Sequence, residues 1–188
     1  MKTIFATFVL TLTLLFVTST IAQEPVLVEE FVGQVVYMQG KIVDLANAVP
    51  QVDYTWRPAE GVRSISEVYL HIAFANYICV TVSGGMVPED VGFVMDFSKA
   101  DEWNTQTTDK TEILEKLNES FAILQERMSV LTDEDLNREV EVFGTKMSTR
   151  NFIISMIGHA HEHLGQSIAY ARINGIVPPW NAKSEDEG

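Results

Sequence analysis

Cysteine is almost absent from this sequence: Cys79 is the only one in 188 residues. A single cysteine cannot form an intramolecular disulfide, and no CxxC pair is present. An isolated cysteine is most often a buried, small hydrophobic residue, and we assign that role to Cys79. The sequence also lacks a glycine-rich phosphate-binding loop and a serine nucleophile elbow, so it shows neither of these common catalytic or nucleotide-binding motifs.

Basic residues are scarce as well. The chain has 13 lysines and arginines against 26 aspartates and glutamates, which gives a formal net charge of −13. This excess of negative charge argues against nucleic acid and against an anionic membrane surface as partners. Hydrophobic residues make up 46% of the chain, which is enough for a packed core and too many for a disordered protein. The length fits one domain behind a leader.

The first 22 residues have the pattern of a signal peptide. Lys2 provides the positive start, an apolar run follows from Ile4 to Val17, and Thr20 and Ala22 are small residues at the cleavage positions. The run is too short and too rich in threonine for a good membrane span. No cysteine stands at the end of this leader, so a lipoprotein anchor is not expected. We predict cleavage after Ala22, export to the periplasm or the medium, and no stable membrane insertion of the mature chain.

The mature chain contains four long segments with the 3.6-residue period of amphipathic helices, over residues 25–48, 64–83, 108–128 and 149–174. Two apolar faces, one in the first segment and one in the third, carry this signal most clearly: Phe31, Val35, Met38, Ile42 and Leu45, and Ile113, Leu117, Phe121, Leu124 and Met128. The segments predict an all-α fold, a four-helix bundle with a long crossover between the second and third helices.

Capping signals mark the ends of these helices. Ser64 with Glu67, and Asp109 with Glu112, have the spacing of capping pairs at the starts of the second and third helices. Gly175 is a natural C-cap for the fourth helix, and a Pro-Pro pair soon after it forbids continuation.

The remaining segments are shorter. The crossover is rich in Gly, Pro, Asp and Thr, and we expect a loop with Trp103 inside it. Charged and apolar side chains alternate along residues 139–143, and Gly-Thr follows. This pattern predicts a small hairpin. We expect the bundle domain to span residues 23–183 and the acidic tail at 184–188 to be disordered.

All four histidines fall at two places. His71 lies in the second helical segment, and His159, His161 and His163 lie in the fourth. Residues four apart on a helix share one face, so His159 and His163 can point at one spot, while His161 lies about 200° around the helix and should be a surface or interface residue. If His71 supplies a third imidazole from a facing helix, the three nitrogens and an open position form the pattern of a catalytic metal site.

Two stretches are similar to motifs of one protein family. Residues 54–73 (YTWRPAEGVRSISEVYLHIA) resemble the first motif of the DinB-like, or DinB/YfiT-type, proteins. Residues 159–166 (HAHEHLGQ), continuing to Trp180, resemble the family's last helix and its exit. The resemblance covers essentially the whole mature chain. It implies a four-helix bundle, commonly a homodimer, that holds a divalent metal ion with His71, His159 and His163.

Two polar side chains flank the predicted ligands. Glu162, three residues after His159, can accept a hydrogen bond from a ligand or act as a base on metal-bound water, and a solvated surface glutamate is the alternative. It is our one candidate catalytic residue. Gln166, three residues after His163, can orient a ligand or a water molecule, or lie at the edge of the core. The ion stays open among zinc, nickel, copper and iron, because imidazole suits all of them.

Two classes of function follow from such a site. The first is an enzyme acting on an unknown small molecule, either a thiol S-transferase, as in some relatives, or a hydrolase. Reduced small thiols are mainly cytosolic, so the predicted leader favours the hydrolase. The second is a non-enzymatic protein of the cell envelope that holds the metal as a structural element. A pocket that reaches the metal favours catalysis, whereas a sealed fourth position favours the structural role.

Overall fold

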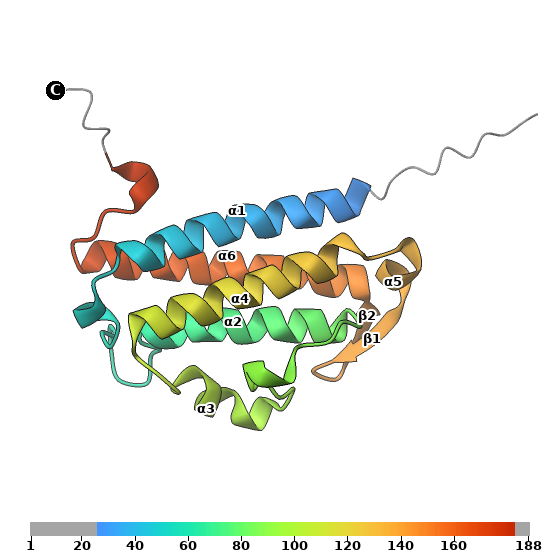
Figure 1. Cartoon of the computed structure of the whole chain (residues 1–188), viewed down its shortest axis with the longest axis horizontal. Coiled ribbons are helices and arrows are strands. Elements are labelled where there is room, and N and C mark those ends of the chain that lie inside the picture. Colours follow the sequence, from blue (N-terminus) through green and yellow to red (C-terminus); the bar gives the residue numbers. More distant parts are fainter. Residues whose placement is uncertain (1–25, 183–188) are drawn as a thin grey trace, which may run out of the picture.

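The computed structural model describes residues 26–182, so the predicted signal peptide and the tail at 184–188 lie outside the described residues. Four long helices run along the long axis of the molecule (Figure 1): α1 (Val26–Ala48), α2 (Ile65–Val82), α4 (Lys110–Ser129) and α6 (Thr149–Ile173). Helices α1 and α2 each pack against both α4 and α6. Therefore α1 and α2 lie diagonally across the bundle, and the predicted four-helix bundle is confirmed.

The predicted apolar faces form the core of this bundle. Every member of the two five-residue sets predicted for the first and third segments is buried. The heptad-like spacing keeps one face of each helix against its neighbours, and removing that apolar surface from water is the main force that holds the bundle together. Cys79 is buried in the same core, and burial raises the pKa of its thiol to about 12, which fits the packing role expected for it.

The start of α2 is fixed by a complete capping box. The Ser64 hydroxyl accepts a hydrogen bond from the Glu67 backbone N–H, and the Glu67 carboxylate accepts one from the Ser64 N–H at 2.9 Å. The other Glu67 oxygen lies 2.5 Å from Arg57 Nη2. These contacts set the register of α2 and therefore the place of His71, less than two turns further on.

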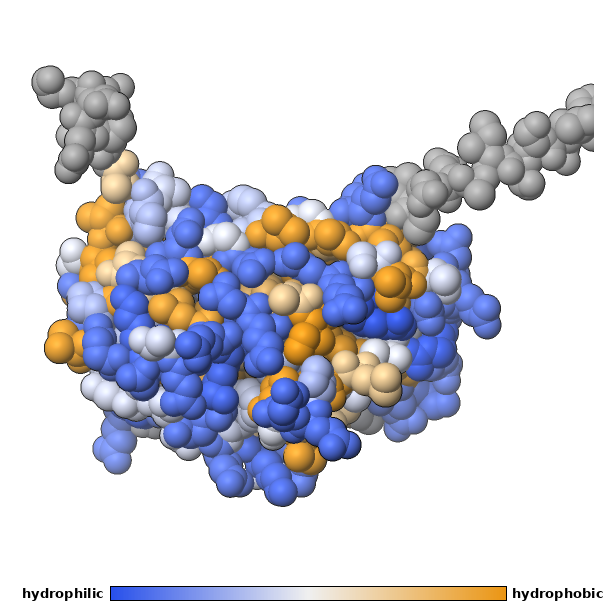
Figure 2. Space-filling view, viewed as in Figure 1, coloured by the Kyte–Doolittle hydropathy of each residue, from blue (hydrophilic) through white to orange (hydrophobic). Residues whose placement is uncertain are grey.

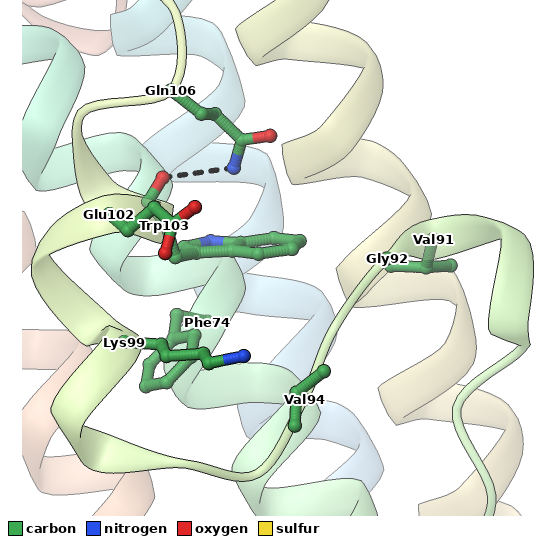
Figure 3. A pocket seen from close by; sticks show the side chains of 8 residues that line it. All are labelled: Phe74, Val91, Gly92, Val94, Lys99, Glu102, Trp103 and Gln106. Atoms are coloured by element: carbon green, nitrogen blue, oxygen red, sulfur yellow. Dashed lines mark hydrogen bonds between the residues drawn. The ribbon is translucent and has the colours of Figure 1, made fainter.

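The crossover is more ordered than the expected loop. It contains η2 (Glu89–Val91), η3 (Phe97–Lys99) and the short helix α3 (Ala100–Asn104), which lies along α2 (Figure 1). Trp103 is buried and donates from Nε1 to the Leu70 carbonyl at 3.1 Å. A five-residue helix is too short to leave a periodic pattern, so its order comes from this tertiary contact. The Trp103 ring also borders a cavity of about 260 Å³ beneath the loop carrying Val91 and Val94 (Figure 3).

The predicted hairpin is present between α4 and α6. After α5 (Asp133–Asn137), the antiparallel strands β1 (Glu139–Val142) and β2 (Thr145–Ser148) pair through Glu139 with Ser148 and Val142 with Thr145. The two turn residues both have positive φ, 53° at Phe143 and 71° at Gly144, as a type I′ turn requires. The Ser148 side chain then caps α6, so the hairpin leads directly into the helix that carries the histidines.

The remaining short elements lie at one end of the bundle, where α1 and α6 both finish (Figure 1). They are η1 (Gln51–Asp53) after α1 and η4 (Pro179–Asn181) after α6. Gly175 has a φ of 76° and follows the last turn of α6, where the predicted helix end is found.

The surface matches the acidic composition. Hydrophilic residues cover most of the face seen in Figure 2, with smaller hydrophobic areas between them. Within residues 26–182, α2 alone has the length and apolar character of a membrane span, with a mean hydropathy of 1.4, and 83% of it is buried inside the protein. That degree of burial is the pattern of a core helix.

Candidate metal centre

Helices α2 and α6 bring the three predicted ligands together. His71 comes from α2, and His159 and His163 come from successive turns of α6. One ring nitrogen from each histidine lies within 4.8 Å of the others, and the Nε2 atoms of His71 and His159 are 3.2 Å apart. The three rings meet edge to face, with centroids 4.4–5.2 Å apart. Residues 88 positions apart in the chain therefore form one cluster.

The spacing and chemistry of these nitrogens fit a divalent metal ion. Two nitrogens bound to zinc at 2.0–2.1 Å in tetrahedral geometry are about 3.3 Å apart, close to the 3.2 Å between His71 and His159 Nε2. Two neutral imidazoles that both present lone pairs at this distance repel each other, and a cation between them removes that repulsion. The geometry therefore provides three neutral nitrogen donors for a single ion.

His161 lies outside the cluster. Its side chain is exposed, and its ring is 6.4 Å from that of Tyr37 on α1, measured between centroids. The helical period places it on the other side of α6 from His159 and His163. It is therefore a surface residue near α1, as the sequence predicted.

Each of the three clustered histidines has a polar side chain near its Nδ1 atom. His163 Nδ1 is 2.8 Å from Gln166 Oε1, and the Gln166 amide donates to the Tyr170 hydroxyl at 2.8 Å. Because the Gln166 oxygen can only accept, His163 carries its proton on Nδ1 and keeps Nε2 free to bind a metal. Gln166 thus orients a predicted ligand, which was one of the two roles considered for it.

Asn104 is the polar side chain nearest to His71 in its effect on the pKa of that ring. His71 Nδ1 and Asn104 Oδ1 are both buried, and neither has a well-formed hydrogen bond within residues 26–182. Asn104 nevertheless lies near enough to raise the pKa of His71 slightly, against the much larger effect of burial. Sequence analysis missed Asn104, because only the packing of Trp103 on α2 brings α3 to the cluster.

Glu162 is the polar neighbour of His159. Its Oε2 atom is 3.9 Å from His159 Nδ1, and its side chain is 81% exposed. Its charge raises the pKa of His159 and of His163, against the larger effect of burial. The carboxylate therefore lies at the outer edge of the cluster, in contact with both solvent and a predicted ligand.

Burial keeps all three histidines neutral. It lowers the pKa of His71 to about 3, with smaller contributions from Arg63 and the other two rings. Burial also lowers the pKa of His159 and of His163, and Arg63 adds to both shifts. Neutral imidazole is the form that binds metals. Arg63 is a further residue that sequence analysis missed, a cation near all three rings.

The metal-free protein should lose stability as the pH falls from 6.5 towards 3. His71 takes up a proton near pH 6.5 in the unfolded chain but only near 3 in the folded protein. Between these values the unfolded state binds more protons, so the free energy of unfolding decreases as the pH falls. Urea unfolding with a chelator at several pH values measures this decrease, and it should be shallower in His71→Leu. If the free energy of unfolding fell equally steeply with pH in the two proteins, the low pKa could not belong to His71.

Loss of Gln166 should weaken metal binding without removing a ligand. Gln166→Leu leaves His163 free to rotate and to move its proton to Nε2. Removal of a group that hydrogen-bonds a metal ligand typically costs about 10–100-fold in affinity. Competition with a chromophoric chelator measures the affinity, and Gln125→Leu on α4, which leaves the cluster intact, is the matched control. Equal affinity in the Gln166 and Gln125 variants would show that Gln166 does not hold the ring.

One side of the cluster opens into a cavity. His71 and His159 line a cavity of about 400 Å³ together with residues of α2, α6, the hairpin and the crossover. The cluster is thus accessible from a space large enough for a small molecule.

Fold and cluster together define a four-helix bundle with a three-histidine site for a metal ion, and comparison with known proteins identifies the family. Residues 34–167 match the model of the DinB superfamily, and the chain belongs to that superfamily. None of the curated proteins matches the sequence.

Solved structures of the same family share the fold. A DinB-like protein from Bacillus cereus has 20% sequence identity and a TM-score of 0.67, over 80% of this chain and 95% of that one. The DinB-like protein YjoA from Bacillus subtilis has 23% identity and a TM-score of 0.58, over 79% and 93%. YfiT from Bacillus subtilis, described as a probable metal-dependent hydrolase with an unusual four-helix bundle topology, has 14% identity and a TM-score of 0.59, over 80% and 89%.

Proposed function

We propose that this protein is a metal-dependent hydrolase whose metal ion is held by His71, His159 and His163. The observation that carries the proposal is the cavity of about 400 Å³ that reaches two of the three histidines. A metal held only as a structural element needs no such access, and structural sites are normally closed by a fourth protein ligand. No fourth histidine, cysteine or carboxylate of residues 26–182 joins the three-residue cluster.

The residues around the site have separable roles in this proposal. A divalent ion held by His71, His159 and His163 would lower the pKa of water and polarise a carbonyl group of a substrate. The three imidazoles, being neutral, leave the positive charge of the ion undiminished. Gln166 keeps the ring proton of His163 on Nδ1, so that its Nε2 atom is free to face the ion. Glu162, at the solvent edge, is the group that accepts and releases a proton.

Two further arguments favour hydrolysis over thiol transfer. YfiT, which shares the fold, is described as a probable metal-dependent hydrolase. In addition, the cavity is lined without a single charged residue, whereas the common small thiol cofactors carry several charges that would lose their hydration there. Export, as predicted from the leader, would also separate the protein from the reduced thiols of the cytosol.

Spectroscopy of the cobalt(II)-loaded protein tests the open coordination position directly. Addition of acetohydroxamate, a small metal-binding probe, should change the visible spectrum of the cobalt site. Zinc-loaded protein should then hydrolyse chromogenic esters or amides, and His71→Ala should lose both properties while His161→Ala keeps them. A spectrum unaffected by the probe, together with a large fall in Tm on metal removal, would identify the metal as a purely structural element instead.

A further inference from the structure

We propose that the cavity beside the histidine cluster binds the hydrocarbon tail of an amphiphilic small molecule whose polar end lies at the metal. The claim that the polar end lies at the metal rests on the proposed function. The claim that the tail is a hydrocarbon follows from the cavity alone. A volume of about 400 Å³ lies within the range of small-molecule sites. Because His71 and His159 form part of its wall, a molecule that fills the cavity reaches the cluster.

The cavity continues directly from the cluster along two helices. On α2, Phe74, Ala75 and Ile78 follow His71 by three, four and seven residues, and all three line the cavity. On α6, Met156, Ser155 and Phe152 precede His159 by the same intervals and line it as well. These intervals keep each set on the face of its own histidine. The helices run in opposite directions (Figure 1), so the two sets lie on the same side of the cluster.

The chemistry of the wall selects an uncharged tail. Apart from the two histidines, Ser155 is the only lining residue with a polar side chain, and its hydroxyl donates to the Asn151 carbonyl at 3.0 Å. No lining residue carries a formal charge, although the chain as a whole has a net charge of −13. A charged or strongly polar group placed there would lose its hydration without gaining a partner, whereas a hydrocarbon gains by leaving water.

Two exposed aromatic side chains complete the outer wall. Phe97 of η3 is 43% exposed and Phe143 of the hairpin turn is 73% exposed, and their ring centroids are 4.6 Å apart. Phe143 has a φ of 53°, in the left-handed region where type I′ turns usually place Asn, Asp or Gly. A bulky aromatic residue is thus kept in a disfavoured backbone conformation at the position that covers the cavity. Strained residues of this kind are concentrated at ligand sites.

Binding of two homologous series tests the proposal. Straight-chain hydroxamic acids from two to eight carbons are titrated into the zinc-loaded protein by calorimetry, and straight-chain alcohols of similar length are titrated into the metal-free protein. The alcohols have no metal to bind and report on the cavity alone. We expect the affinity in both series to rise about fourfold with each added methylene group until the cavity is full.

A pair of neighbouring substitutions on α6 locates the tail. Ser155→Phe places an aromatic ring inside the cavity. It should therefore abolish the rise in affinity with chain length while leaving the affinity for acetohydroxamate unchanged. Ile154→Phe adds a ring at the next position, which is exposed and does not line the cavity. This control should keep the full dependence on chain length.

The outcomes separate this inference from the proposed function. Affinities that do not depend on chain length in either series, or a dependence that survives in Ser155→Phe, would overturn the hydrocarbon site and leave the metal chemistry standing. A rise with chain length in both series, but with no binding of acetohydroxamate to the zinc form, would support the hydrocarbon site and exclude an open metal position.

Discussion

Alanine at His71, His159 or His163 should each reduce the metal content of the purified protein from about one ion per chain to a small fraction. Each substitution leaves two imidazoles, and two neutral nitrogens compete poorly with water and buffer for a divalent ion. Changes in groups that only hydrogen-bond ligands typically cost about 10–100-fold in affinity, so loss of a ligand should cost more than this. Metal analysis of protein purified without added metal, followed by zinc titration, measures both quantities.

The structure supplies a close control for this experiment. His161 lies on the same helix, between two of the predicted ligands, but on the exposed side near Tyr37. His161→Ala should therefore keep the wild-type metal content and the metal-dependent rise in Tm, since a ligand that binds only the folded state stabilises it. If His161→Ala loses the ion, or if His71→Ala retains it, the assignment of ligands fails.

The sequence predicted the bundle because its signals are local. The apolar faces of α1 and α4 and the Ser64–Glu67 capping box depend on residues three or four apart, and the structure shows each of them. The pairing of His159 with His163 is local in the same way. Placement of His71 beside them needed the order of the helices in the bundle, which the family resemblance provided.

The parts that were missed depend on contacts between distant segments. Asn104 lies near His71 only because Trp103, in a five-residue helix, packs on α2. The cavity wall joins Phe97 of the crossover to Phe143 of the hairpin, 46 positions later in the chain. Neither segment has a periodic pattern, and no property of a single phenylalanine shows that it will face another one. The histidine cluster and the position of Gln166 were therefore accessible from sequence, whereas Asn104, Arg63 and the cavity were not.

Glu162→Gln should keep the metal but slow hydrolysis by about 10²–10⁴-fold, the usual contribution of a general acid or base. The substitution removes no ligand and preserves the shape of the side chain. It removes the ability to take up a proton at the edge of the cluster, where Glu162 Oε2 lies 3.9 Å from His159 Nδ1. Measurement of kcat and kcat/KM on the zinc-loaded wild type and variant, at equal metal content, tests this.

A role in orienting His159 predicts a different pattern, and the same variants distinguish the two. The oxygen of glutamine can still accept a hydrogen bond from His159 Nδ1, so an orienting Glu162 would leave the rate of Glu162→Gln within about twofold of wild type. Glu162→Ala would then lose metal affinity by the 10–100-fold typical of a lost partner to a ligand. A proton carrier gives the reverse result: both variants bind zinc almost as well as the wild type, and both are slow. Because the 81% exposed carboxylate exchanges protons freely with solvent, we expect the second pattern, with formate or acetate partly restoring the rate of Glu162→Ala.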